Sequence, residues 1–113
     1  MGSIRIEATR PPWVVARWAF AGYLEHVLAE VRNDAALAHA VEQAMALDGL
    51  HLTLVDRDVA ERLGPVLLRV ADEVIAGTRT ARVEGRELDA RSQEQFRRAV
   101  GELRPLLGAR FCS

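Results

Sequence analysis

Residues 13–31 read WVVARWAFAGYLEHVLAEV and include the longest nearly uncharged stretch of the chain. On a helical wheel at about 100° per residue, one stripe carries most of the large apolar side chains, namely Trp13, Phe20, Leu24, Val27, Leu28 and Val31. Pro11 and Pro12 precede the segment, and proline suits the start of a helix. We therefore predict a helix from Trp13 to about Arg32 with this stripe facing the core.

A second set of apolar and small residues lies on roughly the opposite side of this helix, at Val15, Trp18, Ala19 and Gly22. Both sides of such a helix must be covered. One interpretation is that the N-terminal arm or the last helix of the same chain folds over Trp18. The other is that a second polypeptide covers it, because Trp is a common interface anchor. Our functional hypothesis uses the second, a homodimer interface of Val15, Arg17, Trp18, Ala19 and Gly22.

Arg17 lies within the core stripe of the same helix. We expect its side chain to extend from the helix end or to stack on Trp13, with an interface ion pair as the alternative.

Three further segments have helical periodicity. The first spans about Asp34 to Leu47, with Gly49 as its expected left-handed terminator. The second spans Asp56 to Ala76 and contains Gly64-Pro65, which predicts a kinked helix or two stacked pieces. The third starts at Asp89 or Ser92, and Pro105 and Gly108 are expected to end or bend it.

Three short pieces alternate with a period of two, which is typical of strands: Ile4/Ile6/Ala8, Leu50/Leu52/Leu54 and Thr80 to Glu84. The predicted fold is mainly α, a four-helix bundle-like single domain with two or three short strands or extended arms. We divide it into an N-terminal extended arm (1–12), a helical domain (13–108) and a C-terminal tail (109–113).

The composition excludes several functions. The chain has 113 residues and a net charge of -1, which removes a broad electrostatic reason to bind nucleic acid or a membrane surface. All fifteen basic residues are Arg, so lysine-dependent Schiff-base chemistry and a Walker-type phosphate loop are excluded. The Ala- and Arg-rich composition is typical of a high-G+C bacterial gene. With no apolar signal-peptide core and a single Cys112, we expect a cytoplasmic protein.

Catalytic and metal-binding patterns are weak. An antiparallel hairpin of the first two helices would bring His26 level with His39, with Glu30 and Glu42 nearby, but His39 is predicted to face away from the partner helix. His51 is expected to be half-buried and structural. The three serines lie outside a Gly-x-Ser-x-Gly turn. We expect no enzyme activity, no metal and no cofactor.

The charge is uneven along the chain, with -4 on residues 1–77 and +3 on residues 78–113. An acidic surface on the first two helices, Glu25, Glu30, Asp34 and Glu42, is expected to be solvated or to dock a basic partner. The arginines of the last third form an alternative nucleic-acid patch, namely Arg79, Arg82, Arg86, Arg91 and Arg98. They are interleaved with glutamates on the last helix and lack an aromatic stacking platform.

The leading hypothesis is a small bacterial protein-protein interaction module of the accessory, adaptor or toxin-neutralising (immunity) type, which pairs with itself, another protein or both. A nucleic-acid-binding regulator is the first alternative, and a metal-dependent or small-ligand helical enzyme is the second. We expect neither nucleic acid nor a membrane as the partner.

Overall fold

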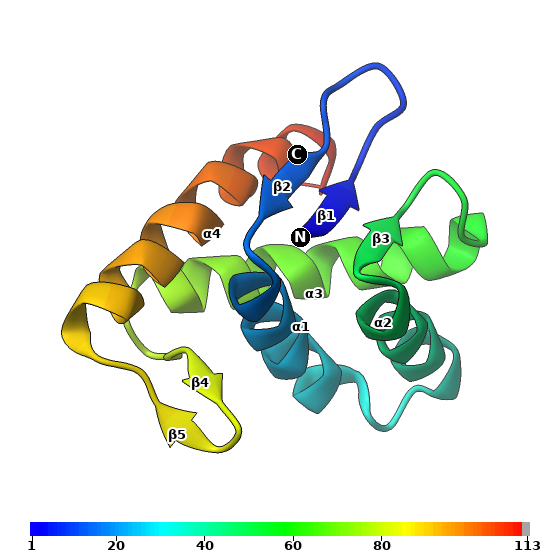
Figure 1. The fold of residues 1–113 in the computed structure, drawn as a ribbon. Coiled ribbons are helices and arrows are strands. Elements are labelled where there is room, and N and C mark those ends of the chain that lie inside the picture. Colours follow the sequence, from blue (N-terminus) through cyan, green and yellow to red (C-terminus); the bar gives the residue numbers. More distant parts are fainter. Residues whose placement is uncertain (112–113) are drawn as a thin grey trace.

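A computed structural model describes residues 1–111 of the chain, and 62% of these residues lie in four helices. The helices are α1 (Arg17–Val31), α2 (Ala35–Leu47), α3 (Arg57–Ile75) and α4 (Ala90–Phe111). Helices α1 and α2 form one antiparallel pair, α3 and α4 form another, and the two pairs cross (Figure 1). The prediction of a mainly α chain is confirmed, whereas a four-helix bundle is not.

Five short strands complete the described part of the chain: β1 (Gly2–Arg5), β2 (Trp13–Val15), β3 (Gly49–His51), β4 (Arg82–Val83) and β5 (Arg86–Glu87). The first three form a sheet in the order β2-β1-β3, with β1 antiparallel to β2 and parallel to β3. This three-stranded sheet packs against the helices. Strands β4 and β5 form a separate hairpin that extends from the body of the molecule (Figure 1).

The start of α1 differs from the prediction, because residues 13–15 form β2 and not the first turn of the helix. Trp13 and Val15 point inward while Val14 is exposed, so the three residues have a strand period of two. Their backbone pairs with β1, with Gly2 opposite Val15. Sheet pairing therefore takes these residues out of the helix.

The remaining boundaries follow the capping residues. Asp34 accepts a hydrogen bond from the backbone N–H of Leu37, and Asp89 accepts one from that of Ser92, so α4 begins beside Asp89. At the end of α2 the left-handed residue is Asp48 (φ 55°) and not Gly49. Helix α4 passes through Pro105 and Gly108 to Phe111, so the predicted tail is helical as far as Phe111.

Helix α3 is one helix through Gly64 and Pro65 and not two pieces. A Cβ atom added to Gly64 would lie 2.2 Å from a ring carbon of Phe111. Glycine is therefore needed for the end of α4 to approach α3. Leu67 and Val70 are completely buried, which places α3 at the centre of the core, whereas Ile75 is 43% exposed.

One core cluster joins all four helices and the three-stranded sheet. Ile4, Trp13 and Leu50, one from each strand, are at most 4% exposed. The Trp13 indole Nε1 donates a hydrogen bond to the Ala99 carbonyl of α4 at 2.8 Å. Residues 1–12 therefore contribute β1, the central strand of the three-stranded sheet.

Candidate functional site

The outward side of α1 combines apolar and charged residues. We define the α1 outward stripe as Trp18, Ala21, Glu25, Leu28, Ala29 and Arg32, which recur at helical spacing on the side away from the core. Ala29, Glu25 and Arg32 are exposed, and the other three residues are partly buried. This side of the helix is therefore accessible along its length.

A groove of about 470 Å³ lies over this stripe, between α1, α2 and the β4–β5 hairpin. Its lining residues are Gly22, Glu25, His26, Leu28, Arg32, Met45 and Arg82. Met45 belongs to α2 and Arg82 to β4, so elements on both sides of α1 contribute to the groove. Together, the stripe and the groove are the candidate site.

The predicted dimer interface is only partly available. Val15 is 8% and Ala19 is 3% exposed, so these two residues belong to the core of their own chain, and the expectation that they are uncovered is wrong. Gly22 is also buried, and a Cβ added there would lie 3.6 Å from the Phe96 ring of α4. Strand β1 and helix α4 cover this side of α1 because both pack directly on it.

Trp18 remains partly exposed, although its ring packs against Phe96 with 6.4 Å between ring centroids. Helix α4 thus covers part of the indole, as the intramolecular interpretation predicts. The rest of the ring remains at the surface, so Trp18 is the large apolar residue of the predicted interface that the fold leaves partly available.

Arg17 does not stack on Trp13 and is exposed. Its Nε donates a hydrogen bond at 2.9 Å to the Asp48 carboxylate that follows α2. This hydrogen bond, together with the positive charge of Arg17, holds the pKa of Asp48 below its ordinary value. Arg17 therefore joins α1 to the end of α2 within one chain.

Two residues of the predicted acidic surface, Glu30 and Asp34, form ion pairs within the chain. Glu30 binds Arg69 and Arg79, and Asp34 binds Arg62 in addition to capping α2. Within residues 1–111, Glu25 and Glu42 have neither a hydrogen bond nor an ion pair. Of these two free carboxylates, only Glu25 lies in the groove.

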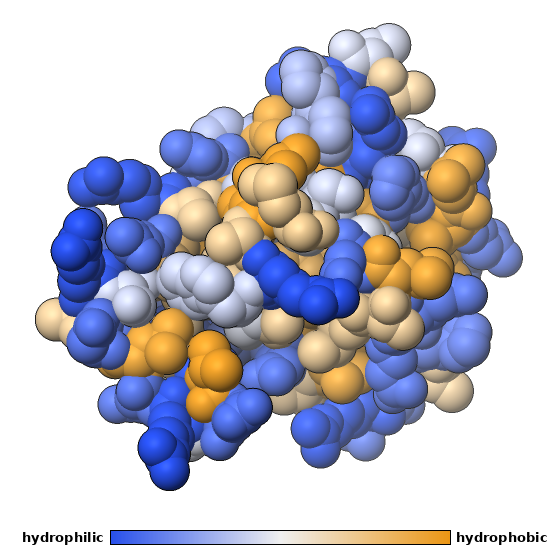
Figure 2. Space-filling view, in the orientation of Figure 1, coloured by the Kyte–Doolittle hydropathy of each residue, from blue (hydrophilic) through white to orange (hydrophobic). Residues whose placement is uncertain are grey.

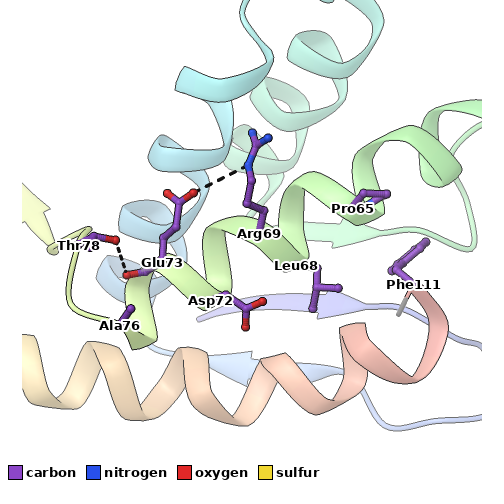
Figure 3. A pocket seen from close by; sticks show the side chains of 8 residues that line it. All are labelled: Pro65, Leu68, Arg69, Asp72, Glu73, Ala76, Thr78 and Phe111. Atoms are coloured by element: carbon purple, nitrogen blue, oxygen red, sulfur yellow. Dashed lines mark hydrogen bonds and ion pairs between the residues drawn. The ribbon is translucent and has the colours of Figure 1, made fainter. Parts of the chain in front are cut away.

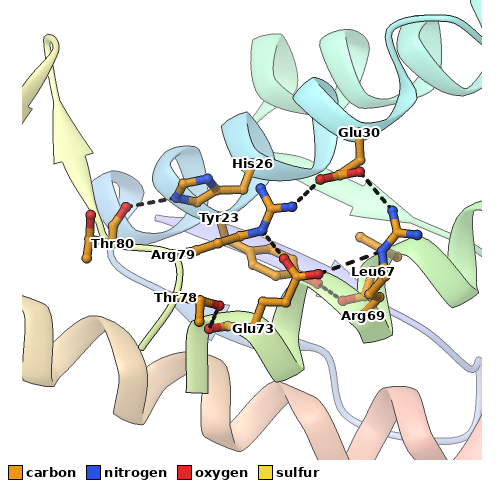
Figure 4. A network of polar contacts seen from close by, with 9 residues as sticks. All are labelled: Tyr23, His26, Glu30, Leu67, Arg69, Glu73, Thr78, Arg79 and Thr80. Carbon is orange, nitrogen blue, oxygen red and sulfur yellow. Dashed lines mark hydrogen bonds and ion pairs between the residues drawn. The ribbon is translucent and has the colours of Figure 1, made fainter. Parts of the chain in front are cut away.

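Arg79 is the centre of a polar network that sequence reasoning missed (Figure 4). Its guanidinium lies between Glu30 of α1 and Glu73 of α3, and its Nε is 2.5 Å from a Glu73 carboxylate oxygen. The hydrogen bond from Arg79 lowers the pKa of Glu30. Arg79 thereby fixes the segment that leads from α3 to the β4–β5 hairpin.

Tyr23 lies beneath this network and is completely buried. Its hydroxyl donates a hydrogen bond to the Leu67 carbonyl at 2.6 Å. Burial, with a smaller contribution from the negative charge of Asp72, raises the pKa of Tyr23 well above its ordinary value. The neutral phenol therefore has a structural role between α1 and α3.

The histidines do not come together as a metal site. His26 Nε2 lies 2.8 Å from the Thr80 carbonyl, and His39 is exposed on α2. His51 lies beside Gly49 and is partly buried, and partial burial is what the sequence predicts for it. Within the part of the chain that the structure describes, no group of three or more His, Cys, Asp or Glu residues could hold a metal ion. Cys112 lies outside the described residues.

The arginines of the predicted nucleic-acid patch lie on three consecutive segments of the chain. Arg79 is held in the polar network, and Arg82 lies 4.0 Å from Glu87 on the neighbouring strand. Arg86 is on the hairpin, whereas Arg91 and Arg98 are on exposed turns of α4. The predicted patch thus draws on the segment before the hairpin, the hairpin itself and α4.

Two further hollows lie away from α1. One of about 480 Å³ runs beside α3, where Pro65 and Leu68 meet Phe111 from the end of α4 (Figure 3). A smaller one lies between α2 and the residues after β3, beside the exposed Leu47 and Leu54. In the view of Figure 2, hydrophobic residues form several areas that hydrophilic residues separate. None of the helices in the described range is long and apolar enough to cross a membrane.

Three residues that line the groove are not predicted as site residues from the sequence, namely Leu28, Arg32 and Met45. Leu28 was assigned to the core stripe, and Arg32 was treated only as the end of the helix. The seven-residue spacing of Glu25 and Arg32 is the signal that places both charges on the outward side.

Comparisons of this chain with protein-family models, curated proteins and solved structures find no match.

Proposed function

We propose that this chain is a protein-protein interaction module that binds a second copy of itself through the α1 outward stripe. The observation that carries the proposal is the accessible groove over α1, in which Leu28 and Met45 lie among charged residues. A mixture of apolar anchors and a polar rim is the usual composition of an interface.

The charge of the whole chain supports a second copy as the partner. The net charge is -1, so two copies carry almost no overall repulsion. Within the groove, Glu25 and Arg32 have opposite charges and are both exposed. A surface that presents both signs can complement itself across a twofold axis.

The substitution Ala29→Arg tests the proposal, because it adds a long charged side chain to the middle of the exposed stripe without altering the core. Multi-angle light scattering of the unaltered chain should give twice the 12.5 kDa monomer mass at high micromolar concentration, and the variant should give the monomer mass. Ala109→Arg, the same substitution at an exposed position of α4, should leave the dimer intact.

Two results would reject the proposal. One is a monomer mass for the unaltered chain at every concentration. The other is a dimer that persists in Ala29→Arg, because this would place the contact elsewhere. Circular dichroism of both variants should match the unaltered chain, since Ala29 and Ala109 are exposed.

A further inference from the structure

The charges on the α1 outward stripe are arranged symmetrically about a point between Leu28 and Ala29. Glu25 and Arg32 are seven residues apart on the same side of α1, with the midpoint between Leu28 and Ala29. At about 1.5 Å per residue they lie roughly 10 Å apart along the helix axis, too far to pair with each other. Both lack a hydrogen bond or ion pair among the described residues.

We infer that two copies of α1 pack antiparallel, with Glu25 of each copy paired to Arg32 of the other. This inference rests on the proposed function and specifies the geometry of the partner. An antiparallel arrangement centred between Leu28 and Ala29 reverses the order of the charges in the second helix. Each Glu25 then lies beside an Arg32, and the twofold axis gives two identical ion pairs.

The small side chain at the centre fits this arrangement. Ala29 is exposed and lies next to the axis, where a short side chain allows two helices to approach closely. Leu28 is partly buried at the same level and supplies apolar contact. A parallel arrangement would instead place Glu25 against Glu25 and Arg32 against Arg32, which is unfavourable.

Glu25 also differs from nearby charged residues, because its carboxylate has no partner among the described residues. Glu30, one turn further along α1, is already bound by Arg69 and Arg79 of its own chain. Arg82 at the side of the groove has Glu87 within 4.0 Å. Glu25 and Arg32 are thus the groove's oppositely charged pair that is available for a partner.

Charge exchange between the two positions tests the arrangement. In Glu25→Arg both intermolecular contacts become Arg against Arg, and in Arg32→Glu both become Glu against Glu. We expect each variant alone to weaken the dimer by at least about tenfold in Kd, measured by sedimentation equilibrium. An equimolar mixture should form a heterodimer with a Kd near that of the unaltered chain, because each contact then pairs Arg with Glu.

Native mass spectrometry separates the heterodimer from both homodimers, because the two variants differ in mass. Glu42→Arg and Arg86→Glu reverse exposed charges outside the groove and should leave the Kd unchanged. Far-ultraviolet circular dichroism should confirm that every variant is folded. Recovery of the dimer in the mixture, together with the loss in each variant alone, supports the antiparallel arrangement.

The contrary results separate this inference from the proposed function. If Ala29→Arg abolishes the dimer but the charge variants do not, α1 is the interface and the antiparallel register is wrong. If each charge variant loses the dimer and the mixture does not restore it, the reciprocal ion pairs are likewise overturned. A monomeric unaltered chain overturns both the inference and the proposed function.

Discussion

The two β-sheets both have short strands, but their surroundings are opposite. In the three-stranded sheet, Ile4, Trp13 and Leu50 are buried against the helices. In the β4–β5 hairpin, all four strand residues are exposed. Short strands are marginally stable alone, so the sheet depends on buried apolar area while the hairpin depends on its polar anchors. The sheet therefore belongs to the core, and the hairpin lies outside it at the edge of the α1 groove.

The hairpin is attached at its base and not along its strands. Gln93 of α4 binds the backbone of Ala81 and Leu88, on either side of the hairpin, and Thr80 binds Glu87. The turn places Glu84 and Gly85 at positive φ, a geometry typical of a two-residue hairpin loop. Arg82 can therefore lie at the edge of the groove although its strand is exposed.

The largest effect is expected where the sheet meets the core. Ile4→Ala removes a side chain that is 1% exposed and should lower the free energy of unfolding by about 2–5 kcal/mol. Val83→Ala in the hairpin, where the side chain is 40% exposed, should change it by less than about 0.5 kcal/mol. Urea unfolding measures both, and equal losses would contradict the division between a buried sheet and an exposed hairpin.

The helices were predictable because each has a long apolar period and a recognisable cap. Asp34 and Asp89 occupy the capping positions, and the apolar stripe of α4, including Phe96 and Leu103, is completely buried. Such local signals do not depend on the rest of the fold. The positions of these helices in sequence were therefore largely correct.

The partners of the strands were not predictable from local pattern. Residues 13–15 satisfy both a helical and a strand period, and pairing with β1 decides between them. The same pairing brings β1 onto Ala19, which removes part of the predicted interface. The available stripe of α1 could be located only after these long-range contacts were known.

A smaller, local effect is expected at the base of the hairpin. Ala81 is completely buried, and its backbone N–H and carbonyl both bind the Gln93 side chain. Gln93→Ala should cost about 1–3 kcal/mol of stability in the hairpin, because buried backbone groups lose their partner. Hydrogen exchange should quicken in residues 80–88 but not in β1 or β3.

Gln95→Ala is the matched control, because Gln95 is exposed on the same helix and has no hydrogen bond within the described chain. It should leave exchange unchanged in both sheets. If Gln93→Ala quickens exchange in the three-stranded sheet equally, the two sheets unfold together and the hairpin is not an independently anchored element.

The smallest effect is expected from acid at the ion pair between Arg79 and Glu30, which holds the segment before the hairpin. The hydrogen bond from Arg79 lowers the pKa of Glu30 from its ordinary value of 4.5, so this ion pair stabilises the fold above that pH. Its contribution, about 0–1 kcal/mol for a largely exposed pair, is lost as the pH falls through the lowered pKa. Carbon-13 NMR should give a Glu30 titration midpoint below 4.5 that rises in Arg79→Gln. An identical midpoint in both proteins would show that Arg79 does not hold Glu30 in solution.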